Sequence, residues 1–198
     1  QFIKIKCFNE KNRTKNQLAF LIPRAGWPGE PNYAHFVCED LPKLKLYKEW
    51  EKHNNNKLKL VLGPKSKRKF VFEFLELFGF KKDDLIYSDS FFLPVSNLIL
   101  AKLYFMHSFK FQSNPNGIKW LGRSLREKVL KNGKVKMRNI FIDRRKIYRR
   151  QVDNFEEIIP ILEKYDFELV NPSDYSVNDQ IKIFAGANVI AGPTGAAF

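Results

Sequence analysis

The chain has 198 residues, of which 44% are apolar and 15% aromatic, so it can fill the core of one large or two small domains and is not a disordered chain. The 35 lysines and arginines against 21 acidic residues give a formal net charge of +14, which predicts an anionic partner: nucleic acid, an acidic membrane surface or a nucleotide diphosphate. The two cysteines, Cys7 and Cys38, form no Cys-x-x-Cys pair and the histidines do not cluster, so neither a disulfide scaffold nor a zinc site is indicated.

The elements expected in the first part of the chain are short strands at 2–6 and 18–22, a turn-rich segment at 23–31, a helix at 34–50, a strand at 58–62 and a helix at 67–78. Pro42 should kink the first helix or divide it in two, because proline has no N–H to donate. Gly79 should end the second helix. No apolar run reaches the roughly 18 residues that a membrane span needs, since Pro94 and Asn97 interrupt the most apolar region, 91–101.

Further elements are expected as brief strands at 85–87, 91–93 and 102–106 and a helix at 116–131 that points Trp120, Leu121, Leu125 and Val129 inward. The Asn132-Gly133 break predicts a domain boundary, which gives units at 1–133 and 134–198. From residue 139 onward the order is strand, helix, strand, helix, strand. This alternation is typical of a parallel sheet with right-handed crossovers, and it predicts the α/β class.

Two helices of the second unit have sequences typical of a capping box. Asn154 precedes Glu157 by three residues, and Ser176 precedes Asp179 in the same way. Pro160 removes a hydrogen bond from the first of these helices, so we expect that helix to start late or to bend.

Two strand ends carry chemistry suited to a phosphate. Five cationic residues lie within the seven positions 144–150, directly after the strand at 139–143. The strand at 188–191 leads into Gly192-Pro193-Thr194-Gly195-Ala196, whose small residues let backbone N–H groups approach a ligand. Arginines grip phosphate oxygens in pairs, and ligands of open α/β sheets bind at the carboxyl ends of strands. A solvated basic turn and a plain tight turn are the alternatives.

Three other groups are candidates. His35 and Glu39 are four residues apart, so they share a helix face where either can act as a general base, although both can equally be structural or solvent-facing. Gln180 is expected to contact a nucleotide or another part of the fold, or else to be an ordinary amide on a helix surface. The basic run 65–69 binds an acceptor, phosphate or lipid headgroups, or is simply solvated.

Several of these residues resemble the sequence pattern of the family 61 glycosyltransferases. The first matching set is Arg144-Arg145, Arg150 and Asn154, then Gln180-Ile181, Phe184, Ala187 and Gly192-x-x-Gly195-Ala196. The second set, Asn32-Tyr33-x-His35-Phe36-x-x-Glu39-x-Leu41-Pro42, is similar to the family's N-terminal segment. The sequence departs from the family at Thr194, where histidine is common, which puts in doubt any role that needs an imidazole there.

The resemblance implies two Rossmann-like units facing across a cleft, the GT-B arrangement. The second unit would hold a UDP-sugar, and the first would present a hydroxyl of a glycan, polysaccharide or glycoprotein acceptor. Donor-binding residues would be Arg144, Arg145, Arg150, Gln180, Gly192, Thr194 and Gly195, and the catalytic residues Glu39 with His35. We expect Arg144 and Arg145 to point to opposite sides, so that only one of them faces the ligand directly.

We expect an inverting transferase that needs no metal and no cofactor besides its donor, because the sequence has no Asp-x-Asp element and the arginines can replace a cation. The chain begins at Gln1 and ends at Phe198 just after the glycine-rich turn, which we interpret as a fragment with an incomplete second unit and poor activity. A polyanion or nucleic-acid binder without catalysis and an inactive scaffold remain alternatives. Expected locations are the cytoplasm or a membrane surface in bacteria, and the secretory-pathway lumen in eukaryotes.

Overall fold

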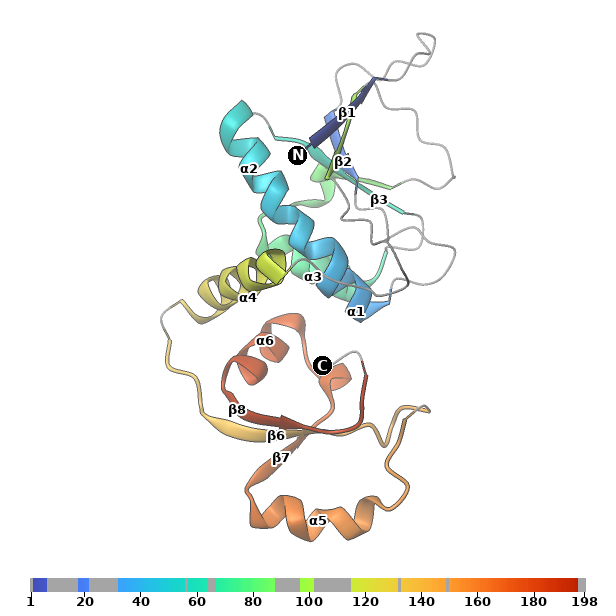
Figure 1. Cartoon of the computed structure of the whole chain (residues 1–198), viewed down its shortest axis with the longest axis vertical. Helices are drawn as coiled ribbons and strands as arrows, with labels where there is room; N and C mark the ends of the chain where they lie inside the picture. Colours follow the sequence, from blue (N-terminus) through green and yellow to red (C-terminus); the bar gives the residue numbers. More distant parts are fainter. Residues whose placement is uncertain are drawn as a thin grey trace. The chain divides into compact units, whose positions relative to one another are not determined.

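The computed structural model describes residues 2–6, 18–21, 32–55, 57–63, 67–87, 97–101, 115–131, 133–148 and 150–195, with the backbone alone for 2–6, 18–21, 97 and 100–101. Contacts divide the chain into two compact units, 1–123 and 124–198 (Figure 1). The division falls inside helix α4 (Pro115–Leu130), ahead of the Asn132-Gly133 break where the sequence predicts it. Each unit has its own sheet.

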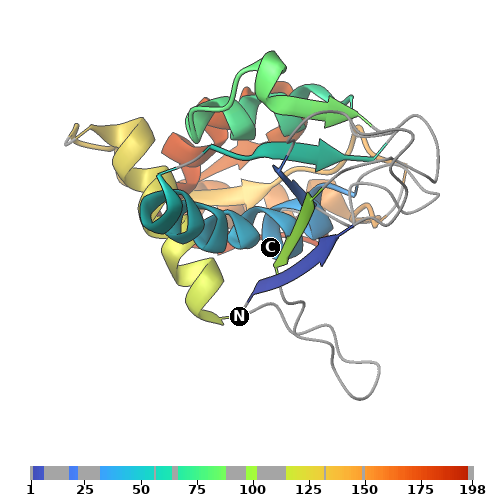
Figure 2. The ribbon, with the colours of Figure 1, turned by 90° about the horizontal axis from the view of Figure 1, so that it is seen from above.

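The first unit contains a five-stranded sheet in the order β1-β5-β2-β3-β4. Its strands are β1 (Phe2–Lys6), β2 (Leu18–Leu21), β3 (Lys59–Leu62), β4 (Leu85–Tyr87) and β5 (Asn97–Ala101). Strand β1 runs antiparallel to β5 at one edge, as Figure 2 shows, and the other neighbouring pairs are parallel. Three consecutive residues of β3, Leu60 to Leu62, are buried, which is typical of a parallel strand covered on both faces.

A continuous helical run begins at Asn32, whose side-chain oxygen accepts a hydrogen bond from the backbone N–H of Ala34 at 3.0 Å. It consists of α1 (Tyr33–His35), the π-helix η3 (Phe36–Asp40), the 3₁₀ helix η4 (Leu41–Lys43) and α2 (Leu44–Asn54). The predicted division near Pro42 is confirmed. Pro42 lies in the short 3₁₀ segment between the π turn and α2, where its missing N–H interrupts no long helix.

The other elements described in the first unit are α3 (Lys69–Leu77), η5 (Lys82–Asp84) and the beginning of α4. Gly79 ends α3 as expected, with a φ of 84° that residues with a Cβ rarely adopt. Trp120 of α4 stacks on Phe78, with ring centroids 5.6 Å apart. Strand β5 was not expected from the sequence, and the strands expected at 91–93 and 102–106 lie outside the described residues.

The second unit is a doubly wound, three-stranded parallel sheet in the order β7-β6-β8. Its elements are β6 (Arg138–Ile142), α5 (Phe155–Lys164), β7 (Phe167–Val170), η6 (Pro172–Asp174), α6 (Val177–Ala185) and β8 (Ala187–Ala191). Helices α5 and α6 cover opposite faces of this sheet (Figure 1). Ile140 belongs to the core on the α6 side and Phe141 to the core on the α5 side, because successive side chains of a strand point to opposite faces.

The predicted helix starts have different outcomes. Ser176 Oγ accepts from the backbone N–H of Asp179 at 3.2 Å and donates to its carboxylate at 2.7 Å, which confirms the cap of α6. The same prediction is wrong for Asn154, whose amide donates to the Glu157 carboxylate instead of capping the backbone. A late start of α5 is also wrong. This helix begins at Phe155 and continues through Pro160, because burial of its apolar face compensates for the missing hydrogen bond.

Candidate active site

The second unit brings the carboxyl ends of β6 and β8 together. Strand β6 is central, and the chain crosses first to β7 through α5 and then back to β8 through α6, on the other side of β6. Phe141 pairs with Ala191 near the ends of the two strands. In open α/β sheets, the point where consecutive connections leave on opposite faces forms a ligand-binding crevice. The residues that follow β6 and β8 therefore form the candidate site.

The turn after β8 is fitted closely to β6 and to the loop that follows it. Gly192 has a φ of 144°, and a Cβ there would lie 2.9 Å from the Cβ of Ile142. A Cβ on Gly195 would overlap the guanidinium of Arg144. Close approach to the backbone of β6 thus requires a glycine at 192, and the absence of a Cβ at Gly195 lets the Arg144 side chain lie against the turn.

Arg150 reaches the same turn from the far end of the basic loop. Its backbone is left-handed, with a φ of 60°, and its Nη1 lies 3.4 Å from the carbonyl oxygen of Thr194. Arg144 and Arg150 therefore both border the turn at 192–195. Two guanidinium groups beside a glycine-containing turn can bind the oxygens of a phosphate or diphosphate.

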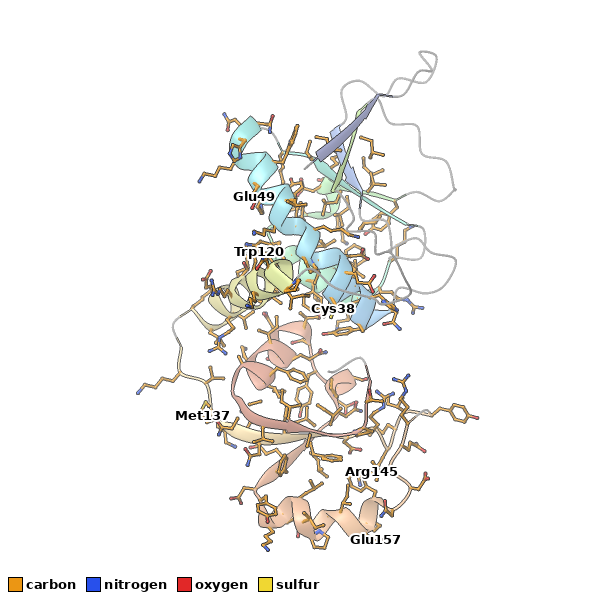
Figure 3. All side chains as sticks on the ribbon, viewed as in Figure 1. Cys38, Glu49, Trp120, Met137, Arg145 and Glu157 are labelled. Carbon is orange, nitrogen blue, oxygen red and sulfur yellow. The ribbon has the colours of Figure 1, made fainter. Side chains whose placement is uncertain are left out.

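Arg145 has a different environment. Its guanidinium makes a two-point pair with the Asp143 carboxylate, at 3.1 Å from Nε to Oδ1 and 2.8 Å from Nη2 to Oδ2. Its guanidinium carbon also lies 4.2 Å from the centre of the Phe155 ring. Figure 3 shows Arg145 in the loop between β6 and α5. The hydrogen bond from Arg145 lowers the pKa of Asp143, so this carboxylate stays ionised.

The same loop has further internal bonds. The backbone N–H of Arg145 donates to Asp143 Oδ1 at 2.9 Å, and the amide of Gln151 donates to the carbonyl oxygen of Arg145 at 2.8 Å. These contacts hold the backbone of Arg145 between Asp143 and Gln151. The sequence interpretation missed the part played by Asp143, Gln151 and Phe155; the only available signal was an aspartate two residues before an arginine at a strand end, which favours a local turn.

Gln180 hydrogen-bonds to the segment that precedes α6. Its amide donates to the carbonyl oxygens of Pro172 and Tyr175, both at 3.0 Å. It thereby holds the segment that contains η6 against the beginning of α6. Of the two roles expected for Gln180, the structural contact is the one that this geometry provides.

His35 and Glu39 lie in the first unit and contact each other. The distance between His35 Nδ1 and Glu39 Oε1 is 2.5 Å, and the two side chains are 42% and 24% exposed. Such a pair can accept a proton at the carboxylate or the imidazole. The next residue, Asp40, points the other way: it is buried and pairs with Lys43 Nζ at 2.6 Å. The π-helical turn thus directs adjacent carboxylates to solvent and to the interior.

The described ranges contain neither a cluster of metal ligands nor a membrane-spanning helix. No three histidine, cysteine, aspartate or glutamate side chains gather closely enough there to hold a metal ion. No helix in that part of the chain is both long and apolar enough to cross a membrane.

The comparisons with known proteins agree with the resemblance seen in the sequence. A sequence profile of the family described as Glycosyltransferase 61 matches residues 33–198, which include His35, Glu39, the basic loop and the turn after β8. No curated protein matches the chain. Because the profile covers most of the sequence, the chain belongs to glycosyltransferase family 61, and it is a transferase that uses a sugar donor and a glycan acceptor.

Proposed function

We propose that this protein transfers a sugar from a UDP-sugar to a hydroxyl group of a glycan or glycoprotein, with inversion and without a metal. The observation that carries the proposal is the position of Arg144 and Arg150, which both border the glycine-containing turn at the carboxyl ends of β6 and β8. Negative charge accumulates on the departing diphosphate during transfer, and fixed guanidinium groups are suited to stabilise it.

The size of the effect supports a role for both arginines. Each charge-assisted hydrogen bond is worth about 1.5–3 kcal/mol. Two such bonds supply a useful part of the roughly 8–23 kcal/mol by which enzymes lower reaction barriers. Backbone N–H groups of the turn 192–195 would add to this stabilisation where they face the same oxygens.

For the acceptor, we assign Glu39 as the general base and His35 as the residue that orients it. Inversion is a single displacement, so it needs one base and no covalent intermediate. Glu39 is accessible and hydrogen-bonded to His35, as such a base requires. In this proposal the first unit serves the acceptor and the second the donor, as in the GT-B arrangement.

The test is calorimetric titration of UDP into the parent protein and into Arg144→Ala and Arg150→Ala. Loss of one charged bond should weaken binding by about 10- to 150-fold. Arg123→Ala, which removes an exposed arginine of α4, is the control and should leave UDP affinity unchanged. Equal affinities in all four proteins, or loss of binding on chelation by EDTA, would remove the metal-independent donor site.

The net charge of +14 supports an alternative to the transferase function, namely the binding of a polyanion. Salt separates the two functions. Binding across many phosphates falls steeply as salt rises, because counterions are released for each phosphate contacted. UDP held by two arginines should show a shallow salt dependence, and a steep one for nucleic acid with no UDP binding would favour the alternative.

A further inference from the structure

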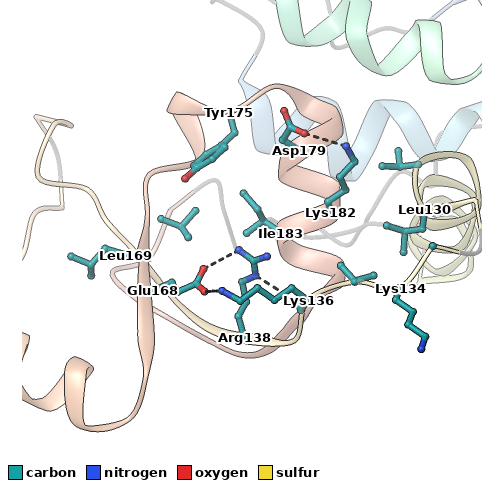
Figure 4. A pocket seen from close by; sticks show the side chains of 14 residues that line it. Leu130, Lys134, Lys136, Arg138, Glu168, Leu169, Tyr175, Asp179, Lys182 and Ile183 are labelled. Atoms are coloured by element: carbon teal, nitrogen blue, oxygen red, sulfur yellow. Dashed lines mark hydrogen bonds and ion pairs between the residues drawn. The ribbon is translucent and has the colours of Figure 1, made fainter.

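A groove in the second unit, separate from the turn after β8, has the features of a ligand site. It has a volume of about 560 Å³ and is bordered by the end of α4, the beginning of β6, strand β7 and helix α6 (Figure 4). Ligand pockets in proteins usually measure about 300–1,000 Å³. The groove therefore has room for a small organic molecule or a short oligomer.

A network of three charged side chains borders the groove. Glu168 of β7 accepts from Arg138 Nη1 at 2.9 Å and from Lys136 Nζ at 2.6 Å. The hydrogen bond from Lys136 lowers the pKa of Glu168, so the carboxylate is ionised at neutral pH. Donor and acceptor groups consequently lie side by side, as the dashed lines in Figure 4 show.

The walls combine apolar and polar groups. Tyr175 is 41% exposed, although its ring is large and apolar. On α6, Asp179 and Lys182 form a second charged pair, with 3.3 Å between Oδ1 and Nζ. A tyrosine ring beside mixed donors and acceptors is suited to a ligand with both apolar faces and polar edges.

The mixture of donors and acceptors in the groove indicates which class of ligand fits. Four cationic and two acidic side chains line the groove, and both acids pair with cations. The carboxylates of Glu168 and Asp179 are acceptors that a phosphate, which has no hydrogen to donate, cannot use, while the surplus of two cations is compatible with an acidic sugar. A sugar hydroxyl both donates and accepts, so it can bond to each kind of group. We propose that this groove is a saccharide-binding site, which holds part of a glycan chain away from the reacting hydroxyl.

None of the described residues that line the groove belongs to the loop at 144–150 or to the turn at 192–195, although the groove extends from Arg138 to Val170, which pairs with Ile142 at the end of β6. Saccharide binding in the groove should therefore be independent of UDP. Only the statement that the bound saccharide belongs to the acceptor or product rests on the proposed function.

The experiment is a titration of the isotope-labelled protein, followed by NMR, with cellotriose, chitotriose and a hyaluronan tetrasaccharide. We expect at least one of them to shift the amide signals of residues 168–170 and 175–183, with a dissociation constant in the millimolar range or tighter, about 4 kcal/mol or more of binding free energy. Tyr175→Ala and Glu168→Gln should each weaken that binding about tenfold. Tyr165→Ala, which removes another exposed tyrosine of the same unit, should not.

The outcomes separate this inference from the donor assignment. Groove variants that bind UDP like the parent but bind the saccharide less tightly support it, whether or not UDP binds at the turn. Circular dichroism spectra that match the parent show that the variants are folded, and the conservative Glu168→Gln change serves if Tyr175→Ala does not fold. Absence of saccharide-induced shifts at millimolar concentration, or equal saccharide affinity in the parent and both groove variants, would overturn it.

Discussion

Arg150 and Thr194 are 44 positions apart in the sequence, yet Arg150 Nη1 lies 3.4 Å from the carbonyl oxygen of Thr194. This distance is at the long end of the range for a hydrogen bond, so the contact orients the guanidinium more than it stabilises the fold. A guanidinium has five N–H donors. One long bond to a carbonyl is compatible with further bonds to phosphate oxygens.

Replacing Gly195 with alanine should weaken UDP binding about tenfold, equal to ~1.4 kcal/mol. The new Cβ overlaps the Arg144 guanidinium, which must leave its position against the turn. Gly122→Ala is the matched control, since a Cβ there meets nothing within 4 Å on the exposed side of α4. The control should retain UDP affinity and gain about 0.5–1 kcal/mol of stability. Calorimetry and thermal melting measure both effects; unchanged affinity in Gly195→Ala would contradict the role of Arg144.

Arg145 should act on UDP binding through the shape of its loop. Arg145→Lys retains the positive charge but loses the two-point pair with Asp143 and the contact with Phe155, so we expect it to weaken UDP binding as much as Arg145→Ala does. Asp143→Asn should have a similar effect. The double variant Asp143→Asn/Arg145→Ala should be no worse than either single change, because one interaction is lost in each case.

A direct contact between Arg145 and the diphosphate would give a different pattern of affinities. If its charge contacts the diphosphate directly, lysine preserves much of the affinity and Asp143→Asn does not weaken binding. Calorimetric titration of UDP into the four variants distinguishes these two patterns.

Glu39→Gln should lower kcat at least ~100-fold, the lower end of general-base contributions, while donor affinity stays the same. His35→Ala should also lower kcat, and the double variant should resemble Glu39→Gln, because the two side chains act as a pair. Glu49→Gln, at an exposed glutamate of α2, is the control. Rates of sugar transfer at saturating donor measure this effect, and an unchanged rate in Glu39→Gln would exclude Glu39 as the base.

Stability should depend on pH through Asp143. The hydrogen bond from Arg145 lowers its folded-state pKa below the unfolded-state value of about 3.9. The contribution is therefore fully present above about pH 5 and is lost as the pH falls through the folded-state pKa. The difference in unfolding free energy between the parent and Asp143→Asn should be larger at neutral pH than in acid. Urea unfolding across this range tests the prediction, and a difference that does not change with pH would contradict it.

The sequence predicted the parallel order of the second unit and the strand ends at which the candidate site lies. The alternating apolar segments and the glycines after residue 191 are local signals. The structure contains the strands and helices that these signals predict. The sequence could not tell which arginine borders the turn. That depends on Asp143 binding Arg145 and on the position of Phe155, which only the folded loop brings together.

Strand β5 shows a second reason why a local sequence pattern can fail to predict structure. Pro94 and Asn97 read as breaks in an apolar region, yet Asn97–Ala101 pairs on both sides with β1 and β2. Pairing with neighbours far apart in the sequence outweighs the weak strand propensity of one asparagine. Pro160 follows the same rule in a helix, since packing on the sheet retains a helix that local propensity disfavours.

The crossover order of the second unit has a consequence for the timing of folding. Strand β6 is synthesised before β7 and β8, and the chain emerges from the ribosome amino end first. Arg144 and Arg150 are thus present in the nascent chain well before the turn at 192–195, against which they lie. The crevice forms only when β8 joins β6. Nucleotide binding there therefore requires the complete sheet of β7, β6 and β8. Ligand present during refolding should then speed recovery of the native state only at steps after β8 has docked.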